Sequence, residues 1–144
     1  MKKSLRVIEF SSPFLVSVEK DADLTQVMSI MTESDIRHIP VTDNDELVGI
    51  ISERDLRVFE NREFATKFQA SDIMVEHPYC VNQSTDLRDV VEKMVFEKYG
   101  SCLIQNDSGE LVGIFTIIDA LRTLNIILAA PEKGPSVQVL AGQE

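Results

Sequence analysis

The sequence predicts an α+β fold in which one β-α-β-β-α unit occurs twice. Two observations lead to this prediction. The pentapeptide Glu-Leu-Val-Gly-Ile stands at 46–50 and again at 110–114. Each copy is followed by an apolar residue, a hydroxyl residue, two further residues and an aspartate, so that Ser52 precedes Asp55 and Thr116 precedes Asp119. Internal symmetry of this kind indicates one supersecondary unit that is used twice.

The agreement between the two halves extends upstream of the pentapeptide. Five residues of the first half recur in the second half in the same order: Val18, Asp23, Leu24, Val27 and Met31 correspond to Val81, Asp86, Leu87, Val90 and Met94. One additional residue near Gly109 explains the change in spacing between the two regions. The repeat therefore covers most of each half.

Hydrophobic spacing assigns the elements of each unit. A short apolar strand is expected first, at 14–18 and 79–81. A helix that begins near Leu24 or Leu87 follows, since apolar residues recur there at helical spacing after polar starts. Two strands joined by a hairpin turn come next, at 39–42 with 47–51 and at 102–105 with 111–115. The remaining elements are a second helix at 53–61 and 117–128, a helical turn at 71–74 and an extra strand at 5–10.

These elements divide the chain into four parts. The first repeat is expected at 11–61 and the second at 78–130, with a linker at 62–77 that contains the short helical turn. A proline- and glycine-containing segment that starts at Pro131 breaks the last helix, so a loose C-terminal tail is expected at 131–144.

Composition limits the classes of function. The chain has 144 residues, and no apolar run approaches the length that crosses a bilayer. Its basic start lacks the apolar segment of a signal peptide, so we expect a cytoplasmic protein without a membrane partner. The net charge of −10 repels nucleic-acid backbones. Any anionic ligand must therefore be held by a local cluster of cations.

The cysteines and histidines do not predict a metal site. Cys80 and Cys102 have apolar neighbours, which is typical of buried reduced thiols. The two histidines, His38 and His77, do not complete a zinc site with them. We interpret His77, which precedes Pro78, as a turn residue.

The doubled Leu-Val-Gly-Ile strand, its Ser/Thr-x-x-Asp extension and the segment Arg37-His38-Ile39-Pro40-Val41 resemble the CBS domain. The resemblance covers Ser11 to Leu128, and two tandem copies form a Bateman module. It implies that the two repeats pack through their sheets with pseudo-two-fold symmetry. It also implies a non-catalytic regulatory module that binds an adenine nucleotide between the repeats.

The Ser/Thr-x-x-Asp motifs are the first candidates for ligand contact. Each stands where a strand turns into a helix, and a helix start offers free N–H groups to a phosphate. The resemblance implies that Asp55 and Asp119 bind ribose hydroxyls, with Ser52 and Thr116 nearby. The alternative is that each motif is only a capping box, which satisfies the donors of a helix end.

The resemblance places the segment before the middle strand of one repeat against the aspartate of the other. Asp55 is thereby matched with Tyr99, Gly100 and Ser101, and Arg54 adds a cation beside it. Tyr99 offers a ring for a purine, and Gly100 allows close approach to the backbone. A solvated Arg54 and an ordinary half-buried Tyr99 are the alternatives.

The second site would combine Asp119 and Thr116 with the segment before the first middle strand, namely Ile36, Arg37, His38 and Pro40. His38 titrates near neutrality and gains affinity for a phosphate when protonated. Arg37 has the alternative of pairing with Asp35 or Glu33. Position 118 holds isoleucine where the first repeat holds Arg54, so we predict that the site around Asp55 is better equipped for phosphate.

The leading hypothesis is a sensor of AMP, ADP or ATP, with or without Mg²⁺, and with no obligatory cofactor. Apolar helix faces, including Met28, Met31 and Met94, predict a homodimer, and the signal would pass to a separate effector protein. S-adenosylmethionine or NAD are alternative ligands, and a ligand-free interaction scaffold is an alternative function. We predict no catalysis, because the sequence offers neither a nucleophile–base pair nor a metal cluster.

Overall fold

The computed structural model describes residues 4–14 and 16–131. The predicted tail at 131–144 lies outside the described residues, apart from Pro131, as do the first three residues. No helix in the described ranges is long and apolar enough to span a membrane.

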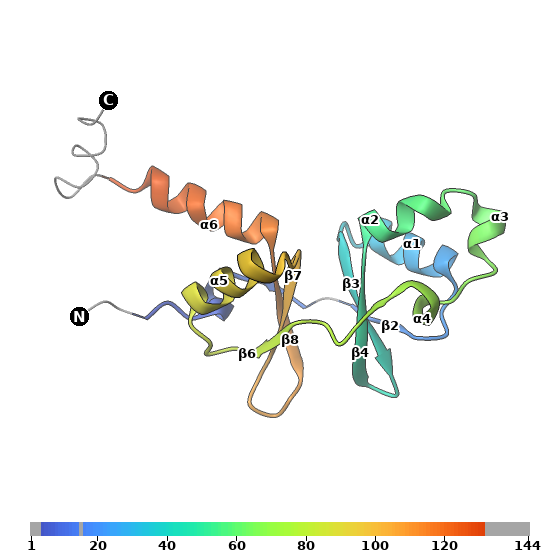
Figure 1. The fold of residues 1–144 in the computed structure, drawn as a ribbon, viewed down its shortest axis with the longest axis horizontal. Coiled ribbons are helices and arrows are strands. Elements are labelled where there is room, and N and C mark those ends of the chain that lie inside the picture. The colour runs from blue at the N-terminus through green and yellow to red at the C-terminus, as the bar shows by residue number, and fades with distance from the viewer. Residues whose placement is uncertain (1–3, 15, 132–144) are drawn as a thin grey trace.

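Two four-stranded sheets form the centre of the protein (Figure 1). One sheet has the order β2-β3-β4-β5 and contains β2 (Val18–Glu19), β3 (His38–Asp43), β4 (Glu46–Ser52) and β5 (Val75–Glu76). The other has the order β1-β8-β7-β6 and contains β1 (Ser12–Pro13), β8 (Leu111–Thr116), β7 (Ser101–Gln105) and β6 (Cys80–Asn82). Each sheet combines a parallel outer strand, an antiparallel hairpin and a short antiparallel strand. This confirms the predicted α+β fold and its symmetry.

The main helices lie on the side of the sheets away from the hairpin turns (Figure 1). They are α1 (Leu24–Glu33), α2 (Glu53–Leu56), α5 (Leu87–Glu97) and α6 (Ile117–Ala129). The first and third begin at Asp23 and Asp86, whose carboxylates accept hydrogen bonds from backbone N–H groups of the first turn. The Thr25 hydroxyl also donates to Asp23 Oδ1, and this bond, together with those from the backbone, lowers the pKa of Asp23 below its usual value.

Shorter elements complete the chain and correct two expectations. The predicted helix at 53–61 is divided into α2 and the 3₁₀ turn η2 (Arg57–Phe59). Residues 5–10 do not form a strand: Val7–Phe10 is the 3₁₀ helix η1, and Val7 is fully buried in the second core. The two other short helices are α3 (Arg62–Ala65) and α4 (Ala70–Ile73), and α4 matches the predicted helical turn.

Each repeat has its own hydrophobic core, in which the helix packs on its sheet. The first core contains Val18, Leu24, Val27, Met31, Ile39, Val41, Ile51, Leu56, Ala65 and Ala70. The second contains Val7, Leu87, Val90, Met94, Cys102, Ile104 and Phe115. Met31 and Met94 are therefore core residues, and Met28 packs at the edge of the first core.

The short fourth strand of each sheet comes from the segment before the other repeat. Strand β1 pairs with β8, so that Ser12 lies opposite Ile114. Strand β5 pairs with β4, so that Val75 lies opposite Ile50. Because Ile50 and Ile114 end the repeated pentapeptide, Ser12 and Val75 occupy equivalent positions. Each repeat thus receives its edge strand from the segment that precedes the other repeat.

The register of α5 on its core gives a direct test of this fold. Val90 is fully buried, whereas Val95, one and a half turns later, is 73% exposed. Val90→Ala should lower the free energy of unfolding by about 2 kcal/mol through lost burial and a cavity. The same change at Val95 should alter it by less than about 0.5 kcal/mol. Urea unfolding of both variants measures the difference, and equal losses would contradict the register.

Candidate ligand-binding cleft

A cleft of about 600 Å³ lies between the two repeats. Its walls come from the starts of β3 and α2 in the first repeat, from the residues around β5, and from the starts of β7 and α6 in the second repeat. These are the places where each Ser/Thr-x-x-Asp motif and each segment before a middle strand stand. A molecule in this cleft would contact both repeats at once.

The structure gathers most of the predicted site residues at this cleft. All six residues of the predicted main site line it: Ser52, Arg54, Asp55, Tyr99, Gly100 and Ser101. Three residues assigned to the second site line the same cleft, namely Arg37, His38 and Thr116. The main-site residues and half of the second-site residues therefore share one cleft.

Asp55 lies at the strand–helix junction with part of its carboxylate available. Its Oδ2 accepts a hydrogen bond from the Ser52 N–H (2.9 Å), and its own N–H donates to Ser52 Oγ (3.3 Å). The motif is thus a capping box, as the alternative held. In the described part of the chain, however, Oδ1 of Asp55 has no donor. The same side chain can close the helix and still accept a hydroxyl from a ligand.

The helix start at 53 offers fewer free N–H groups to a phosphate than the sequence predicts. Helix α2 is only four residues long. The N–H of Glu53 already donates to the carbonyl of Arg37 (2.8 Å), and those of Ser52 and Asp55 serve the capping box. A phosphate in this cleft would therefore depend mainly on cationic side chains.

The cleft contains a local excess of cations. Four of them line it, Arg37, Arg54, Arg57 and Lys98, against the carboxylates of Glu53 and Asp55. Arg37 pairs with Glu53 (Nε–Oε2 3.7 Å) and not with Asp35 or Glu33. That pair is exposed and weak, so a phosphate can displace Glu53 from it. In a chain of net charge −10, this grouping favours an anion.

Sequence reasoning missed Arg57 and Lys98. Arg57 follows Arg54 by three residues, a spacing that places both on one side of a helical turn. Lys98 directly precedes Tyr99 and ends α5 in the left-handed conformation (φ 61°), which turns the chain into the cleft. The helical spacing was readable from the sequence, whereas the turn at Lys98 was not.

His38 faces Gly100 across the cleft. A Cβ atom built on Gly100 would lie 3.8 Å from His38 Nε2, so the segments before the two middle strands meet here. Burial lowers the pKa of His38 below its usual 6.5, and the charges of Asp55 and Asp119 partly oppose this effect. His38 is therefore neutral at neutral pH and can take up a proton when an anion arrives.

Two tyrosines, Tyr79 and Tyr99, line the cleft together with the cations. Tyr99 is 38% exposed, and its ring lies 5.3 Å from that of Tyr79 with an interplanar angle of 32°. Pro78 and His77 line the same cleft. His77 has φ 53°, as a turn residue would, and it is also part of the cleft. An exposed ring face held by a second ring is suited to stacking on a base.

Asp119 is placed differently from Asp55. It is 2% exposed and does not line the cleft, although Thr116 does. Its Oδ1 accepts hydrogen bonds from the Ser12 hydroxyl (2.8 Å) and from Arg122 Nη1 (2.9 Å). Its Oδ2 accepts from the N–H and the hydroxyl of Thr116 (2.9 and 3.1 Å). Every direction of this carboxylate is already occupied.

Two other residues of the predicted second site lie away from the cleft. Ile36 lines a separate hollow between α1 and α2. Pro40 is buried within β3, opposite Ile50. The structure therefore does not bring Ile36, Pro40 and Asp119 into one open site.

The cysteines carry no reactive or metal-binding arrangement within the described residues. Both are free thiols, on the neighbouring strands β6 and β7. Burial raises the pKa of Cys102 to about 12 and also raises that of Cys80. No group of three His, Cys, Asp or Glu side chains in the described ranges could hold a metal.

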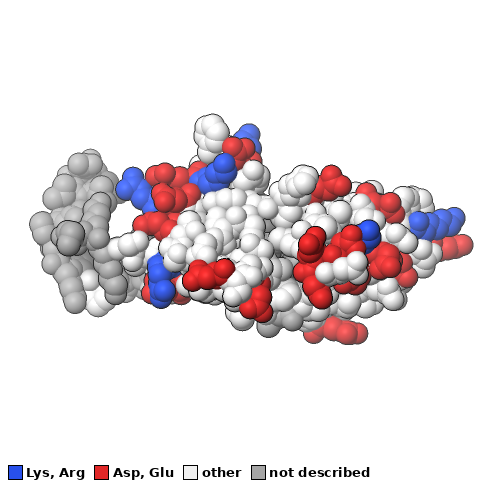
Figure 2. Space-filling model, turned by 90° about the horizontal axis from the view of Figure 1, so that it is seen from below, with Lys and Arg blue, Asp and Glu red and all other residues white. Residues whose placement is uncertain are grey.

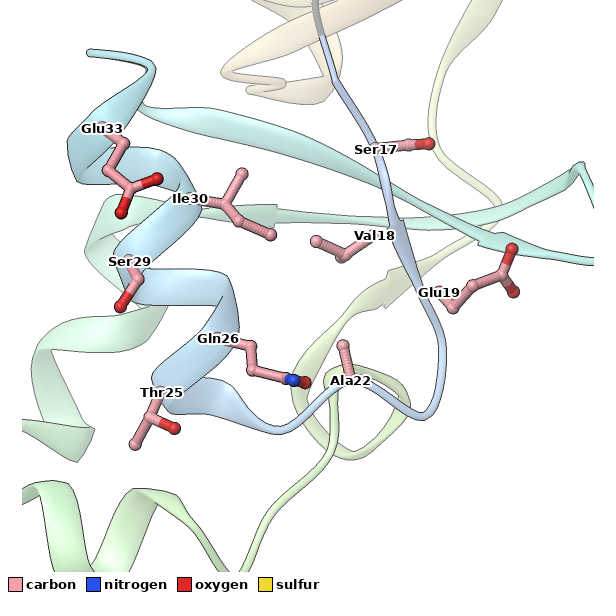
Figure 3. Close-up of a pocket in the computed structure, with 9 residues that line it drawn as sticks. All are labelled: Ser17, Val18, Glu19, Ala22, Thr25, Gln26, Ser29, Ile30 and Glu33. Atoms are coloured by element: carbon pink, nitrogen blue, oxygen red, sulfur yellow. The ribbon is translucent and has the colours of Figure 1, made fainter.

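Other surfaces are less suited to an anion. A groove of about 510 Å³ between α1 and β2 contains Glu19 and Glu33 and no cation (Figure 3). On the face shown in Figure 2, acidic side chains gather over the first repeat with few basic ones between them. The cation-rich cleft therefore differs from its surroundings.

Comparison with known proteins identifies the family. The model of the CBS domain matches the chain twice, at residues 7–60 and 70–126. An inosine-5'-monophosphate dehydrogenase of Methanocaldococcus jannaschii is 29% identical over 128 residues, which make up 88% of this chain and 25% of that enzyme. A CBS domain-containing protein of Dictyostelium discoideum is 25% identical over 134 residues, 85% of this chain and 92% of the relative.

Solved structures agree in fold. The structure of CBSX2 in complex with AMP superposes with a TM-score of 0.70 and 25% identity, over 85% of this chain and 97% of CBSX2. The CBS domain of a bacterial CNNM/CorC family Mg²⁺ transporter in complex with ATP gives 0.72 and 22%, over 81% and 84%. With the doubled unit, the exchanged strands and the two family matches, this chain belongs to the CBS domain family as a tandem pair.

Proposed function

We propose that the protein is a regulatory module that binds an adenine nucleotide in the cleft around Asp55. The observation that carries this proposal is the composition of the cleft. It combines four cations, an aromatic wall and a carboxylate oxygen without a donor in the described structure, within a strongly acidic chain. A ribose requires an acceptor, a base requires an apolar wall, and phosphates require cations.

The cleft offers a contact residue for the ribose, the base and the phosphates of a nucleotide. Oδ1 of Asp55, which has no donor among the described residues, would accept a ribose hydroxyl. Tyr99 would pack against the base, and Gly100 leaves room for it. The phosphates would lie toward Arg54, Arg57 and Lys98, with His38 between the repeats. AMP, ADP and ATP share these features, and Mg²⁺ would accompany the longer phosphates.

The family comparison supports the same class of ligand. CBSX2, whose length this chain nearly matches, was solved with AMP. The inosine-5'-monophosphate dehydrogenase contains a related segment that makes up only a quarter of its own chain. We extend to this chain the role of a regulatory CBS pair in the cytoplasm, without catalytic activity of its own.

We further propose that two copies associate through the helices. Large apolar side chains of α6 are between about half and three quarters exposed: Ile117, Ile118, Leu121, Leu124, Ile126, Ile127 and Leu128. Val95 and Phe96 of α5 add to the exposed apolar surface. Since monomers rarely expose so much apolar surface, a second copy would cover it. A separate effector would read the state of the dimer.

The apolar surface of α6 also favours the alternative, a scaffold that dimerises without any ligand. The scaffold would bind a partner through its acidic face (Figure 2). S-adenosylmethionine and NAD are alternative ligands that also carry an adenosine. The scaffold and the sensor are separated by whether any of these molecules stabilises the protein.

The first test is nucleotide binding. AMP, ADP or ATP should raise the melting temperature in a saturable manner, because a ligand that binds only the folded state stabilises it. Asp55→Ala should weaken binding at least about tenfold, since it removes a hydrogen bond to a charged group. Asp119→Ala should weaken binding less. Equal losses would contradict the ranking of the two aspartates, and no stabilisation by any adenosine ligand would favour the scaffold.

The second test concerns pH. Burial holds the pKa of free His38 below 6.5, and a bound phosphate raises it. Binding then takes up a proton, so affinity for AMP should rise as pH falls from about 7.5 toward 6, by roughly three- to tenfold. AMP itself titrates near pH 6, so the measure is the difference from His38→Gln at each pH. Parallel pH profiles of the two proteins would exclude a role for His38.

The third test concerns association. Light scattering on a sizing column should give a dimer at tens of micromolar. Leu124→Lys should shift it toward monomer, because it places a charge on the apolar surface of α6. Ser108→Lys, at the exposed turn between β7 and β8, introduces the same charge away from the helices and should leave the dimer intact. A monomeric wild-type protein would refute the proposed interface.

A further inference from the structure

The two aspartates of the repeated motif have different partners, although the motif is the same. Four hydrogen bonds reach the carboxylate of Asp119, two of them from outside its own motif: Ser12 Oγ donates at 2.8 Å and Arg122 Nη1 at 2.9 Å. In the described structure, Asp55 accepts only the bond from the Ser52 N–H. The difference therefore arises outside the repeated motif.

The internal symmetry shows where these donors come from. Ser12 of β1 lies opposite Ile114, just as Val75 of β5 lies opposite Ile50. Arg122 follows Asp119 by three residues, and Val58 follows Asp55 by three. Both donors that reach Asp119 are thus replaced by valine in the other half. A valine has no group that could donate to Asp55.

We infer that the N-terminal strand β1 and Arg122 close the site at Asp119, so that each chain binds a single nucleotide. The Ser12 hydroxyl and the Arg122 guanidinium occupy the acceptor that a ribose would need. The strand is held in place, since Phe14 N–H donates to the carbonyl of Val112 (3.2 Å) and the Ser12 carbonyl lies against Gly113. This inference rests on the proposed nucleotide site. It assigns the acceptor positions of the second motif to two side chains of the protein itself.

Closure predicts a binding stoichiometry. Isothermal titration of the full chain with AMP should give one site per chain, and Asp119→Asn should leave its affinity within about twofold. The opening variant Ser12→Val/Arg122→Val copies the first repeat onto the second. It should bind two AMP molecules per chain, and adding Asp119→Asn to it should remove the second. Two sites in the wild-type protein, or a single site in the opening variant, would overturn the inference.

The reverse exchange tests the same donors at Asp55. The closing variant Val75→Ser/Val58→Arg adds a cation beside the cleft, so an effect of charge alone would tighten AMP binding. Closure predicts the opposite, a loss of at least about tenfold for both AMP and adenosine, because the carboxylate is then occupied. Tighter or unchanged binding of AMP would count against closure. Adenosine, which lacks phosphate, separates the two effects.

A readout without ligand keeps this inference separate from the proposed function. Hydrogen exchange should show faster exchange of the Phe14 amide in the opening variant than in the wild-type protein, because β1 loses its bond to Asp119. If no variant binds a nucleotide, the proposed function fails, and exchange still decides whether Ser12 and Arg122 close Asp119. Equal exchange rates would show that they do not.

Discussion

Neither repeat completes its own sheet, and this constraint organises the molecule. Each hairpin presents an edge that needs a further strand, and the segment before the opposite repeat supplies it. The N-terminal segment therefore belongs to the second core through Val7, and the segment after α4 belongs to the first sheet. The exchange fixes the two repeats against each other and brings their strand–helix junctions together at one cleft.

The exchange also breaks the symmetry that it creates. The two short strands have equivalent places but unrelated sequences, because one precedes the first repeat and the other connects the two. The Ser12 hydroxyl donates a hydrogen bond to the buried carboxylate of Asp119. Val75 has no side-chain donor, so the half-buried carboxylate of Asp55 stays open to the cleft. A buried carboxylate needs hydrogen-bond donors from the protein, whereas a carboxylate at a cleft can accept them from solvent or from a ligand. Equal motifs thereby acquire different surroundings.

The doubled unit was predictable from the sequence, since repeat spacing and hydrophobic periodicity are local signals. The six main-site residues were predicted through the resemblance to the CBS domain, which matches each aspartate with a segment of the other repeat. The fold is confirmed, whereas the ligand contacts of those residues stay a prediction. The burial of Asp119 was not predictable, because it depends on Ser12, more than a hundred residues away. The 3₁₀ turn at Val7–Phe10 was missed for a similar reason: its apolar residues pack on the second repeat. Lys98 enters the cleft through a left-handed turn, which no local pattern at that lysine indicates.

Helix α6 connects the cleft with the exposed apolar surface. Its first turn, from Thr116 to Ile118, lines the cleft, and the same helix continues into the side chains that we assign to the dimer.

A nucleotide can alter the dimer only if it binds one placement of α6 more tightly than another. Because a rigid helix moves as a unit, a small shift at Ile118 is carried to Leu128 at the far end. The cations that we propose to bind phosphate lie on the first repeat and at the end of α5, so ligand charge would draw these elements toward the start of α6. The cleft and the dimer surface would then share one coupling free energy, and dimer geometry would in turn change nucleotide affinity.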